Sequence, residues 1–155
     1  MRPTVLYGEH ELNLDEKNRI SIPAEVRRCL DPDRDGEAFF IVIGINRKPW
    51  LYPERVYENL VSQSASTLGP DEDALMFDQL NFSLAQKATW DAQGRMQLQQ
   101  SVLRRAKLDK ELTLVGVKDH LELWNRAEWF EHSEQLLEQR STIAERRRQQ
   151  AKSGT

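Results

Sequence analysis

The sequence carries one pattern twice, once in each half of the chain. Residues 14–22 read LDEKNRISI and residues 90–98 read WDAQGRMQL, so each copy has an apolar residue, an Asp, a turn, an Arg and an alternating segment. The match continues downstream, because an apolar segment that reads FIVIGI in the first half reads LTLVGV in the second. An internal repeat constrains the architecture more than any local motif does. We therefore expect a pseudo-symmetric molecule that presents two equivalent turns.

Hydrophobic alternation and turn residues predict the same order of elements in both halves. In the first half we expect strands near 5–7 and 11–14, a tight turn at 15–18 and a strand at 20–22. A helix at 24–30 and an acidic loop at 31–37 should follow. The half should end with a buried strand at 39–45, a strand at 50–52 and a helix that begins at Pro53. In the second half we expect a short helix at 74–80 and then a strand with one apolar face, formed by Phe82, Leu84, Gln86, Ala88 and Trp90. The second turn and its strand, a helix at 102–106 and strands at 112–117 and 121–124 should follow. One last helix should run towards Arg146, before a frayed end from Gln149.

A change in composition marks the boundary between the repeats. Residues 62–73 are rich in Ser, Gly, Pro and acidic side chains, which is typical of a linker. We expect a first repeat at 5–61, a linker with a short helix at 62–81, a second repeat at 82–130 and a C-terminal helical extension with a basic tail at 131–155. These elements predict an α+β fold built from two equivalent repeats.

Composition limits the classes of protein to which the chain can belong. Of its 155 residues, 39% are apolar and 30% are charged, and no segment approaches the roughly 20 apolar residues of a membrane span. The N-terminal residues do not resemble a signal peptide. Cys29 is the single cysteine, so we expect no internal disulfide and a reducing, cytoplasmic compartment. The net charge of −3 conceals an uneven distribution, since acidic residues collect in 31–37 and 71–73 and basic residues collect in the C-terminal tail.

Each repeated turn pairs an Asp with an Arg. Asp15 and Asp91 can accept hydrogen bonds from backbone amides a few residues later and so close the turn. Asn18 and Gly94 occupy the position that most needs a positive φ, which Gly adopts freely and Asn tolerates better than most residues. We therefore expect both turns to be tight and rigid.

The arginine that follows each turn has two interpretations. Arg19 and Arg95 each leave the turn at the end of a strand, which would direct a planar, always-charged group at a phosphate or at the O6 and N7 atoms of guanine. The alternative is that each Arg pairs with a neighbouring Asp and only locks the hairpin. Two copies in register, each followed by the same strand and helix, favour a functional role over a structural one.

These residues resemble the MraZ family, two-repeat members of the SpoVT/AbrB-like swapped-hairpin DNA-binding fold. Each half of those proteins has an Asp-x-x-Gly-Arg turn, an apolar–x–apolar–Pro step into a helix, and a buried strand that ends in Gly. The matching residues here are Asp15, Arg19, Ile20, Ile22, Pro23 and Gly44, then Asp91, Gly94, Arg95, Met96, Leu98 and Gly116. The chain departs from the pattern at two positions, with Asn18 in place of the first Gly and Gln99 in place of the second Pro.

The resemblance implies a fold in which the two repeats intertwine their hairpins into one pseudo-dimeric core with flanking helices. It implies a cytoplasmic, nucleoid-associated transcription regulator. It also implies a ring-shaped homo-oligomer that binds direct-repeat boxes of double-stranded DNA near the division and cell-wall gene cluster. Arg19 and Arg95 would contact the DNA, and Asp15 and Asp91 would organise the turns. Lys17 would contact a phosphate by its position alone, because its counterpart is Gln93.

Other functions have less support in the sequence. An AbrB-like antitoxin could use the basic tail to neutralise a toxin, but such antitoxins usually have one repeat per chain. A ring-forming structural protein without DNA affinity is a second alternative. His10, His120, His132 and Cys29 lack the spacing of metal ligands, and no catalytic constellation emerges, so we expect no enzyme activity, metal, cofactor, small-molecule substrate or membrane partner. Arg146, Arg147 and Arg148 form either a solvated helix end or a non-specific DNA clamp.

Overall fold

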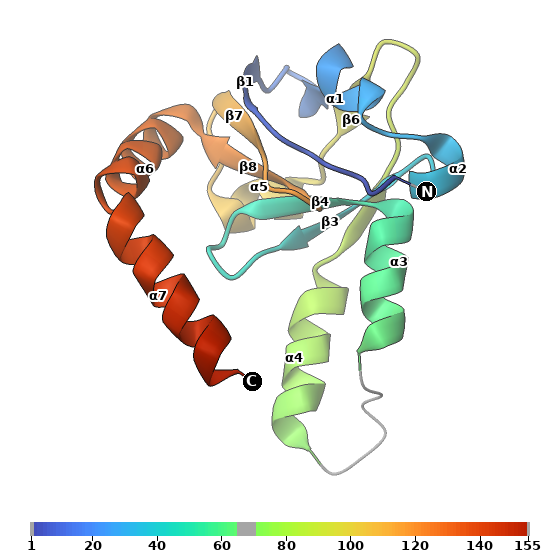
Figure 1. The fold of residues 1–155 in the computed structure, drawn as a ribbon. Helices are drawn as coiled ribbons and strands as arrows, with labels where there is room; N and C mark the ends of the chain where they lie inside the picture. Colours follow the sequence, from blue (N-terminus) through green and yellow to red (C-terminus); the bar gives the residue numbers. More distant parts are fainter. Residues whose placement is uncertain (1, 65–70, 155) are drawn as a thin grey trace. The chain divides into compact units, whose positions relative to one another are not determined.

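The computed structural model describes residues 2–64 and 71–154 (Figure 1). The chain forms two compact units, Met1–Asn125 and Arg126–Thr155. The N-terminal unit combines a mostly antiparallel sheet with short helices, and the C-terminal unit is helical. Among the described residues, no helix is both long enough and apolar enough to cross a bilayer.

The described residues of the N-terminal unit form eight strands in two sheets. The strands are β1 (Glu9–Asn13), β2 (Arg19–Ser21), β3 (Phe39–Ile43), β4 (Pro49–Pro53), β5 (Gln86–Ala88), β6 (Arg95–Gln97), β7 (Glu111–Gly116) and β8 (Leu121–Asn125). Six of them form one sheet in the order β1-β7-β8-β4-β3-β5, and β2 pairs with β6 in a separate two-stranded ribbon. Every pairing of these strands is antiparallel.

The sheet order shows how the two repeats are intertwined. The first strand of each repeat leaves its own half and pairs with the other, because β1 pairs with β7 and β5 pairs with β3. The central contact joins β4 to the equivalent strand β8. The order therefore reads the same from either edge when repeat equivalents are exchanged, which confirms the predicted α+β fold of two intertwined repeats.

Seven helices are described. The N-terminal unit contains α1 (Ala24–Arg28), α2 (Pro32–Asp35), α3 (Glu54–Gln63), α4 (Glu72–Ser83) and α5 (Gln100–Ala106). The C-terminal unit consists of α6 (Arg126–Glu138) and α7 (Arg140–Ser153).

The predicted strand from Phe82 to Trp90 is largely wrong. Phe82 belongs to α4, which extends beyond the expected residues 74–80 at both ends. The carboxylate of Asp71 accepts hydrogen bonds from the amides of Asp73 and Ala74 and so caps the start of the helix. Only Gln86–Ala88 form a strand, and Trp90 makes an isolated bridge to Met96.

Three smaller predictions also need correction. The expected acidic loop contains the helix α2, which Asp31 caps by accepting a bond from the Asp33 amide at 2.9 Å. The expected linker begins late, since Ser62 and Gln63 still belong to α3, and residues 65–70 lie outside the described part of the chain. The single C-terminal helix is two helices that meet at Gln139, and α7 continues to Ser153 rather than fraying from Gln149.

The core lies between the sheet and the ribbon. Its largest fully buried side chains come from both repeats: Phe39, Leu6, Ile20, Ile22, Ile41, Leu51, Met96, Leu98, Leu112, Leu114, Leu121 and Leu123. Gly116 is required where the chain crosses itself, because a Cβ atom there would lie 2.3 Å from the backbone nitrogen of Tyr7. The repeats therefore share one core that places the ribbon on the surface of the unit.

Candidate nucleic-acid interface

The β2–β6 ribbon brings the two predicted turns together. In its register, Arg19 lies opposite Gln97, Ile20 opposite Met96, and Ser21 opposite Arg95. Side chains alternate between the two faces of a strand. Ile20 and Met96 are buried beneath the ribbon, so the other four side chains share its outer face.

The first turn is closed by Asp15. Its Oδ1 atom accepts hydrogen bonds from the amides of Lys17 at 2.9 Å and Arg19 at 2.8 Å. The Asn18 amide donates to the Asp15 carbonyl at 3.0 Å, and Asn18 adopts φ of 60°. In this structure the Asp15 side chain closes the turn, and Asn18 holds the backbone conformation with positive φ.

The second turn has the same geometry. Oδ1 of Asp91 accepts from the amides of Gln93 at 3.0 Å and Arg95 at 2.9 Å. The Gly94 amide donates to the Asp91 carbonyl at 2.9 Å, and Gly94 adopts φ of 81°. Two different residues at the positive-φ position therefore give equivalent backbone turns.

Each turn is also held by the other repeat. The Ile22 amide donates to the Gly94 carbonyl at 2.7 Å, and the Leu98 amide donates to the Asn18 carbonyl at 2.9 Å. These two bonds extend the ribbon symmetrically beyond both of its ends. The turns therefore form one rigid surface rather than two independent hairpins.

Each arginine is oriented by the Asp of its own turn. Arg19 Nε lies 2.8 Å from Asp15 Oδ2, and Arg95 Nε lies 3.0 Å from Asp91 Oδ2. The side chains of the two arginines remain 25% and 38% exposed. The two arginines lie diagonally across the ribbon, a separation of about 7–8 Å between strand positions. The pairing of each Arg with a neighbouring Asp, which was the alternative interpretation of the sequence, is therefore present. It leaves the terminal nitrogens of both guanidinium groups on an open face.

The turn geometry stabilises both aspartates in their charged form. The backbone amide of Arg19, together with the Arg19 guanidinium and the Lys17 amide, holds the pKa of Asp15 below its usual value. The equivalent bonds, led by the Arg95 amide, lower the pKa of Asp91. Both turns are thus maintained by ionised carboxylates at neutral pH.

The side chains between Asp and Arg differ in their contacts. Within the described residues, the Lys17 ammonium has no partner and is exposed. In the second turn, the Gln93 Oε1 atom accepts a bond from Arg95 Nη2 at 2.7 Å. Gln97 reaches across the ribbon and donates from Nε2 to the Lys17 carbonyl at 2.6 Å. The first turn therefore presents an exposed positive charge where the second presents a hydrogen-bonded amide.

A buried glutamine that the sequence analysis missed supports the second turn. Gln86 Nε2 donates to the Gln97 carbonyl, and its Oε1 accepts from the Gln99 amide, both at 3.0 Å. The equivalent position in the first repeat is Pro23, and Pro has no amide hydrogen. Gln86 thus satisfies the donor that this departure introduces. The signal in the sequence was a polar residue at an otherwise apolar strand position, between Leu84 and Ala88.

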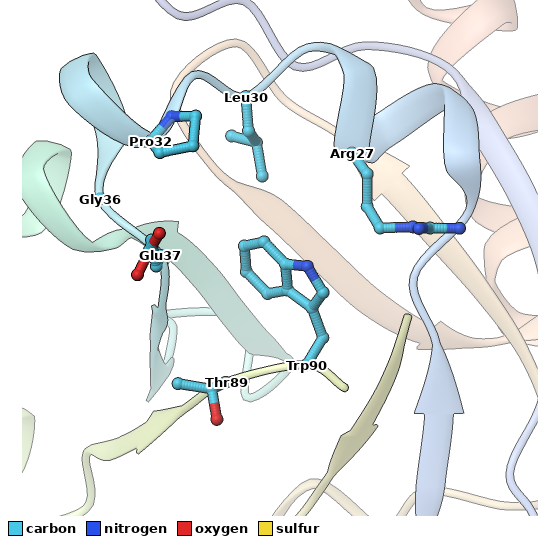
Figure 2. Close-up of a pocket in the computed structure, with 7 residues that line it drawn as sticks. All are labelled: Arg27, Leu30, Pro32, Gly36, Glu37, Thr89 and Trp90. Carbon is cyan, nitrogen blue, oxygen red and sulfur yellow. The ribbon is translucent and has the colours of Figure 1, made fainter. Parts of the chain in front are cut away.

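Arg27 of α1 is a second residue that the sequence analysis missed. Its Nε donates to the Ile22 carbonyl at 3.1 Å, and a Cβ atom added to Gly94 would lie 2.9 Å from that same nitrogen. Arg27 also borders an open cavity of about 550 Å³ beside the second turn. Figure 2 shows the Trp90 indole and Leu30 directed into this cavity, with the Arg27 guanidinium extending away from the indole. A basic side chain therefore packs against the second turn.

His120 has a structural role in a cluster with two carboxylates and an aromatic ring. His120 bonds to Asp119 at 2.8 Å and to Glu122 at 2.9 Å, and its ring stacks on Trp50 at 4.2 Å. Burial lowers the pKa of His120, but the bonds to the two carboxylates outweigh it and raise the pKa overall. Across residues 2–64 and 71–154, no group of three or more His, Cys, Asp or Glu side chains is arranged to hold a metal ion.

Comparison with known proteins gives the same family as the motifs. The family model described as "MraZ protein, putative antitoxin-like" matches residues 5–78 and again residues 82–152. A protein of Azoarcus sp. (strain BH72) named transcriptional regulator MraZ is 36% identical over 133 residues, which cover 86% of this chain and 89% of the relative.

Two further relatives carry the same name. That of Moorella thermoacetica is 32% identical over 142 residues, covering 92% of this chain and 96% of the relative. That of Desulforamulus reducens is 31% identical over 141 residues, covering 91% of this chain and 96% of the relative. The double match of the family model agrees with the intertwined repeats of the fold, and the chain therefore belongs to the MraZ family.

Proposed function

We propose that the chain is a transcription regulator that binds double-stranded DNA in a sequence-specific manner through the outer face of the β2–β6 ribbon. The observation that carries this proposal is the placement of Arg19 and Arg95 on one exposed face, each fixed through Nε by the Asp of its turn. The names of the relatives, which describe transcriptional regulators, support the same conclusion.

The chemistry of the ribbon suits the major groove. A two-stranded ribbon fits that groove, and the terminal nitrogens of Arg form paired hydrogen bonds with guanine O6 and N7. The Asp–Nε contacts restrict the guanidinium before DNA arrives, which reduces the entropy lost on binding. Lys17, exposed at the edge of the face, would contact a phosphate and position the ribbon without reading the sequence.

A single ribbon offers few contacts for a tight, specific site. Specific complexes normally combine many phosphate and base contacts. We therefore include a homo-oligomer in the proposal, arranged as a ring, so that several ribbons bind direct-repeat boxes together and gain effective concentration. Boxes spaced by about one turn of the duplex would face the same side. We further propose that these boxes lie near the division and cell-wall gene cluster. The protein would be cytoplasmic and associated with the nucleoid.

The test removes each arginine in turn. Arg19→Ala and Arg95→Ala should each weaken binding by about 1–3 kcal/mol if the side chain makes a paired base contact. The duplex would be a tandem-box fragment selected by the wild-type protein from a genomic library, and electrophoretic mobility would report affinity. Arg55→Ala is the matched control, because Arg55 is exposed on α3 rather than on the ribbon.

The outcome separates the alternatives. Loss of affinity in both ribbon variants, with unchanged thermal unfolding and an unaffected control, supports the proposal. Unchanged affinity in both would remove the arginine turns from recognition. A wild-type protein that selects no duplex at all would favour the structural ring without DNA affinity, and the antitoxin alternative would then call for a search for a bound toxin.

A further inference from the structure

The outer face of the β2–β6 ribbon breaks the pseudo-symmetry at one pair of positions. Ser21 and Gln97 are equivalent in the two repeats, because each follows its arginine by two residues. In the register of the ribbon, Gln97 lies opposite Arg19, and Ser21 lies opposite Arg95. Both Ser21 and Gln97 are exposed. The repeats therefore place a long amide side chain beside one arginine and a short hydroxyl beside the other.

Gln97 is held through both its backbone and its side chain. Its backbone carbonyl accepts a hydrogen bond from the buried Gln86 side chain at 3.0 Å. Its Nε2 atom donates to the Lys17 carbonyl at 2.6 Å, which directs the side chain across the ribbon to the first turn. A carboxamide has two N–H donors and one oxygen acceptor. Among the described residues, the second N–H and the Oε1 atom of Gln97 have no partner, so both remain available.

The arginine opposite Gln97 keeps the donors that recognise guanine. The Nε atom of Arg19 lies 2.8 Å from Asp15 Oδ2, and this contact leaves both terminal nitrogens to bind O6 and N7. Directly opposite residues of antiparallel strands have Cβ atoms about 4.5–5.5 Å apart, and successive bases of one DNA strand lie about 3.4 Å apart along the helix axis. Arg19 and Gln97 can therefore contact adjacent base pairs.

We propose that Gln97 is a further specificity-determining residue, which recognises an adenine in the base pair next to the guanine that Arg19 contacts. Its Oε1 atom would accept a hydrogen bond from adenine N6, and its second Nε2 hydrogen would be donated to N7. This is the paired contact that glutamine makes with adenine in the major groove. The inference rests on the proposed function and deepens it, because it assigns a second base to one end of the ribbon.

The other end of the ribbon lacks this second contact. A serine hydroxyl has one donor and can bind either kind of base, so Ser21 cannot make the paired contact that selects adenine. In addition, the Gln93 Oε1 atom accepts a bond from Arg95 Nη2 at 2.7 Å. The ribbon therefore specifies a guanine and an adjacent adenine at the Arg19 end, and a guanine alone at the Arg95 end.

The first experiment measures base preference as well as affinity. The wild-type protein selects a tandem-box fragment from a genomic library, and each base pair of one box is then replaced in turn by the other three. At one position the wild type should prefer A·T by about 5- to 150-fold, and Gln97→Ser, which makes the two ends equivalent, should abolish this preference. The preference for G·C at the adjacent position, which Arg19→Ala should remove, should remain in Gln97→Ser.

A second variant of the same residue should change the preferred base. Gln97→Glu keeps the shape of the side chain but offers only acceptors, and a carboxylate accepts a bond from cytosine N4. The preference at this position should therefore change from A·T to C·G. Gln79→Glu is the matched control, because Gln79 is exposed on α4 rather than on the ribbon, and this variant should keep every wild-type preference.

A third variant adds the contact where it is absent. Ser21→Gln places an amide opposite Arg95 and should create a preference for A·T next to the second guanine. Ser21 is exposed, and its hydroxyl makes no bond among the described residues. This variant should therefore fold even if replacing Gln97 prevents folding, and thermal unfolding is measured for every variant.

The results distinguish base recognition from a structural role. If Gln97 only holds the first turn through the Lys17 carbonyl, its variants should bind all duplexes more weakly with unchanged base preferences. That result, or no gain from Ser21→Gln where the Gln97 variants do not fold, would overturn the inference. Loss of affinity in Arg19→Ala and Arg95→Ala would then leave the proposed function intact, whereas a wild-type protein that selects no duplex would overturn both.

Discussion

The two arginine turns have the same backbone but not the same surface. Both close through an Asp that accepts two backbone amides, and both fix an Arg through Nε. In the first turn, Lys17 is free of partners among the described residues. In the second turn, Gln93 bonds to Arg95 and reduces the number of guanidinium hydrogens that remain available.

The comparison separates what the fold requires from what recognition can vary. The ribbon needs an Asp, a positive φ and an Arg at matched positions, and both halves retain them. The side chains that point outwards differ between the turns, so the first turn offers an exposed charge and the second offers a hydrogen-bonded amide. The pseudo-symmetric molecule is therefore expected to bind its site asymmetrically.

The largest expected effect comes from the positive-φ position. Gly94→Val should lower the free energy of unfolding by about 1–3 kcal/mol from backbone strain alone. The new Cβ atom would add a close contact, since it would lie 2.9 Å from Arg27 Nε and 3.1 Å from the Ile22 carbonyl oxygen. Asn18→Val should cost less, because Asn18 already accommodates a Cβ atom, and Asn18→Gly should be neutral or slightly stabilising. Chemical denaturation measures all three.

The ranking of these variants tests the equivalence of the turns. A Val at position 18 that is tolerated as well as Gly would contradict the positive φ in the first turn. Equal losses in Gly94→Val and Asn18→Val would show that the Arg27 contact adds nothing to the strain at Gly94.

The next effect concerns the buried glutamine of the second half. Gln86→Ala should lower the free energy of unfolding by about 1–3 kcal/mol, because it leaves the Gln99 amide and the Gln97 carbonyl without their partner. In the first half the equivalent helix follows Pro23, which has no amide to satisfy. Gln99→Pro should therefore lose less stability in the Gln86→Ala background than in the wild type. Additive losses in a double-mutant cycle would contradict the proposed compensation.

The local features of the site could be predicted from the sequence. The positive φ at Asn18, the closing bonds of both Asp residues and the exposed Arg19 and Arg95 depend on spacings of a few residues, which sequence patterns report directly. The repeat predicted the same elements twice, and the resemblance to the MraZ family added the expectation that the two repeats intertwine. The function of the two arginines stays a prediction that the binding experiments decide.

The features that could not be predicted depend on contacts between distant segments. Gln86 meets Gln97 and Gln99 only after the chain has turned back, and Arg27 meets Gly94 only after the repeats have intertwined. Phe82 alternated with later apolar residues as a strand would, but it lies in the last turn of α4, which ends at Ser83. The alternation of apolar residues does not show where the preceding helix ends.

A smaller effect is expected from exchanging the outer residues of the turns. Lys17→Gln should make the first turn resemble the second, and it should lower the salt dependence of DNA binding by about one phosphate contact per engaged turn. Gln93→Lys should have the opposite effect and should also release Arg95 from its bond to Gln93. Affinity measured over a series of salt concentrations gives both slopes. Unchanged slopes in both variants would show that neither position lies near a phosphate.

The smallest effect should appear in the pH dependence of stability. The pKa values of Asp15 and Asp91 are lowered in the folded protein, first by the amides of Arg19 and Arg95 and then by their guanidinium groups. A lowered pKa stabilises the fold above the unfolded pKa of about 4, and this contribution is lost as the pH falls through the folded value.

Asp15→Asn and Asp91→Asn keep an acceptor for the amides but remove the charge, so each variant should lose less stability than the wild type between pH 6 and pH 3. Other carboxylates with lowered pKa values, including Asp35 and Glu122, contribute to the wild-type slope, and they remain in both variants. The difference between wild type and variant therefore isolates the turn. Because the two turns have equivalent hydrogen bonds, the difference between wild type and Asp15→Asn should equal the difference between wild type and Asp91→Asn within error. A clear inequality in urea unfolding would show that Lys17 or Gln93 changes the electric field at the carboxylate as well as the proposed DNA-binding surface.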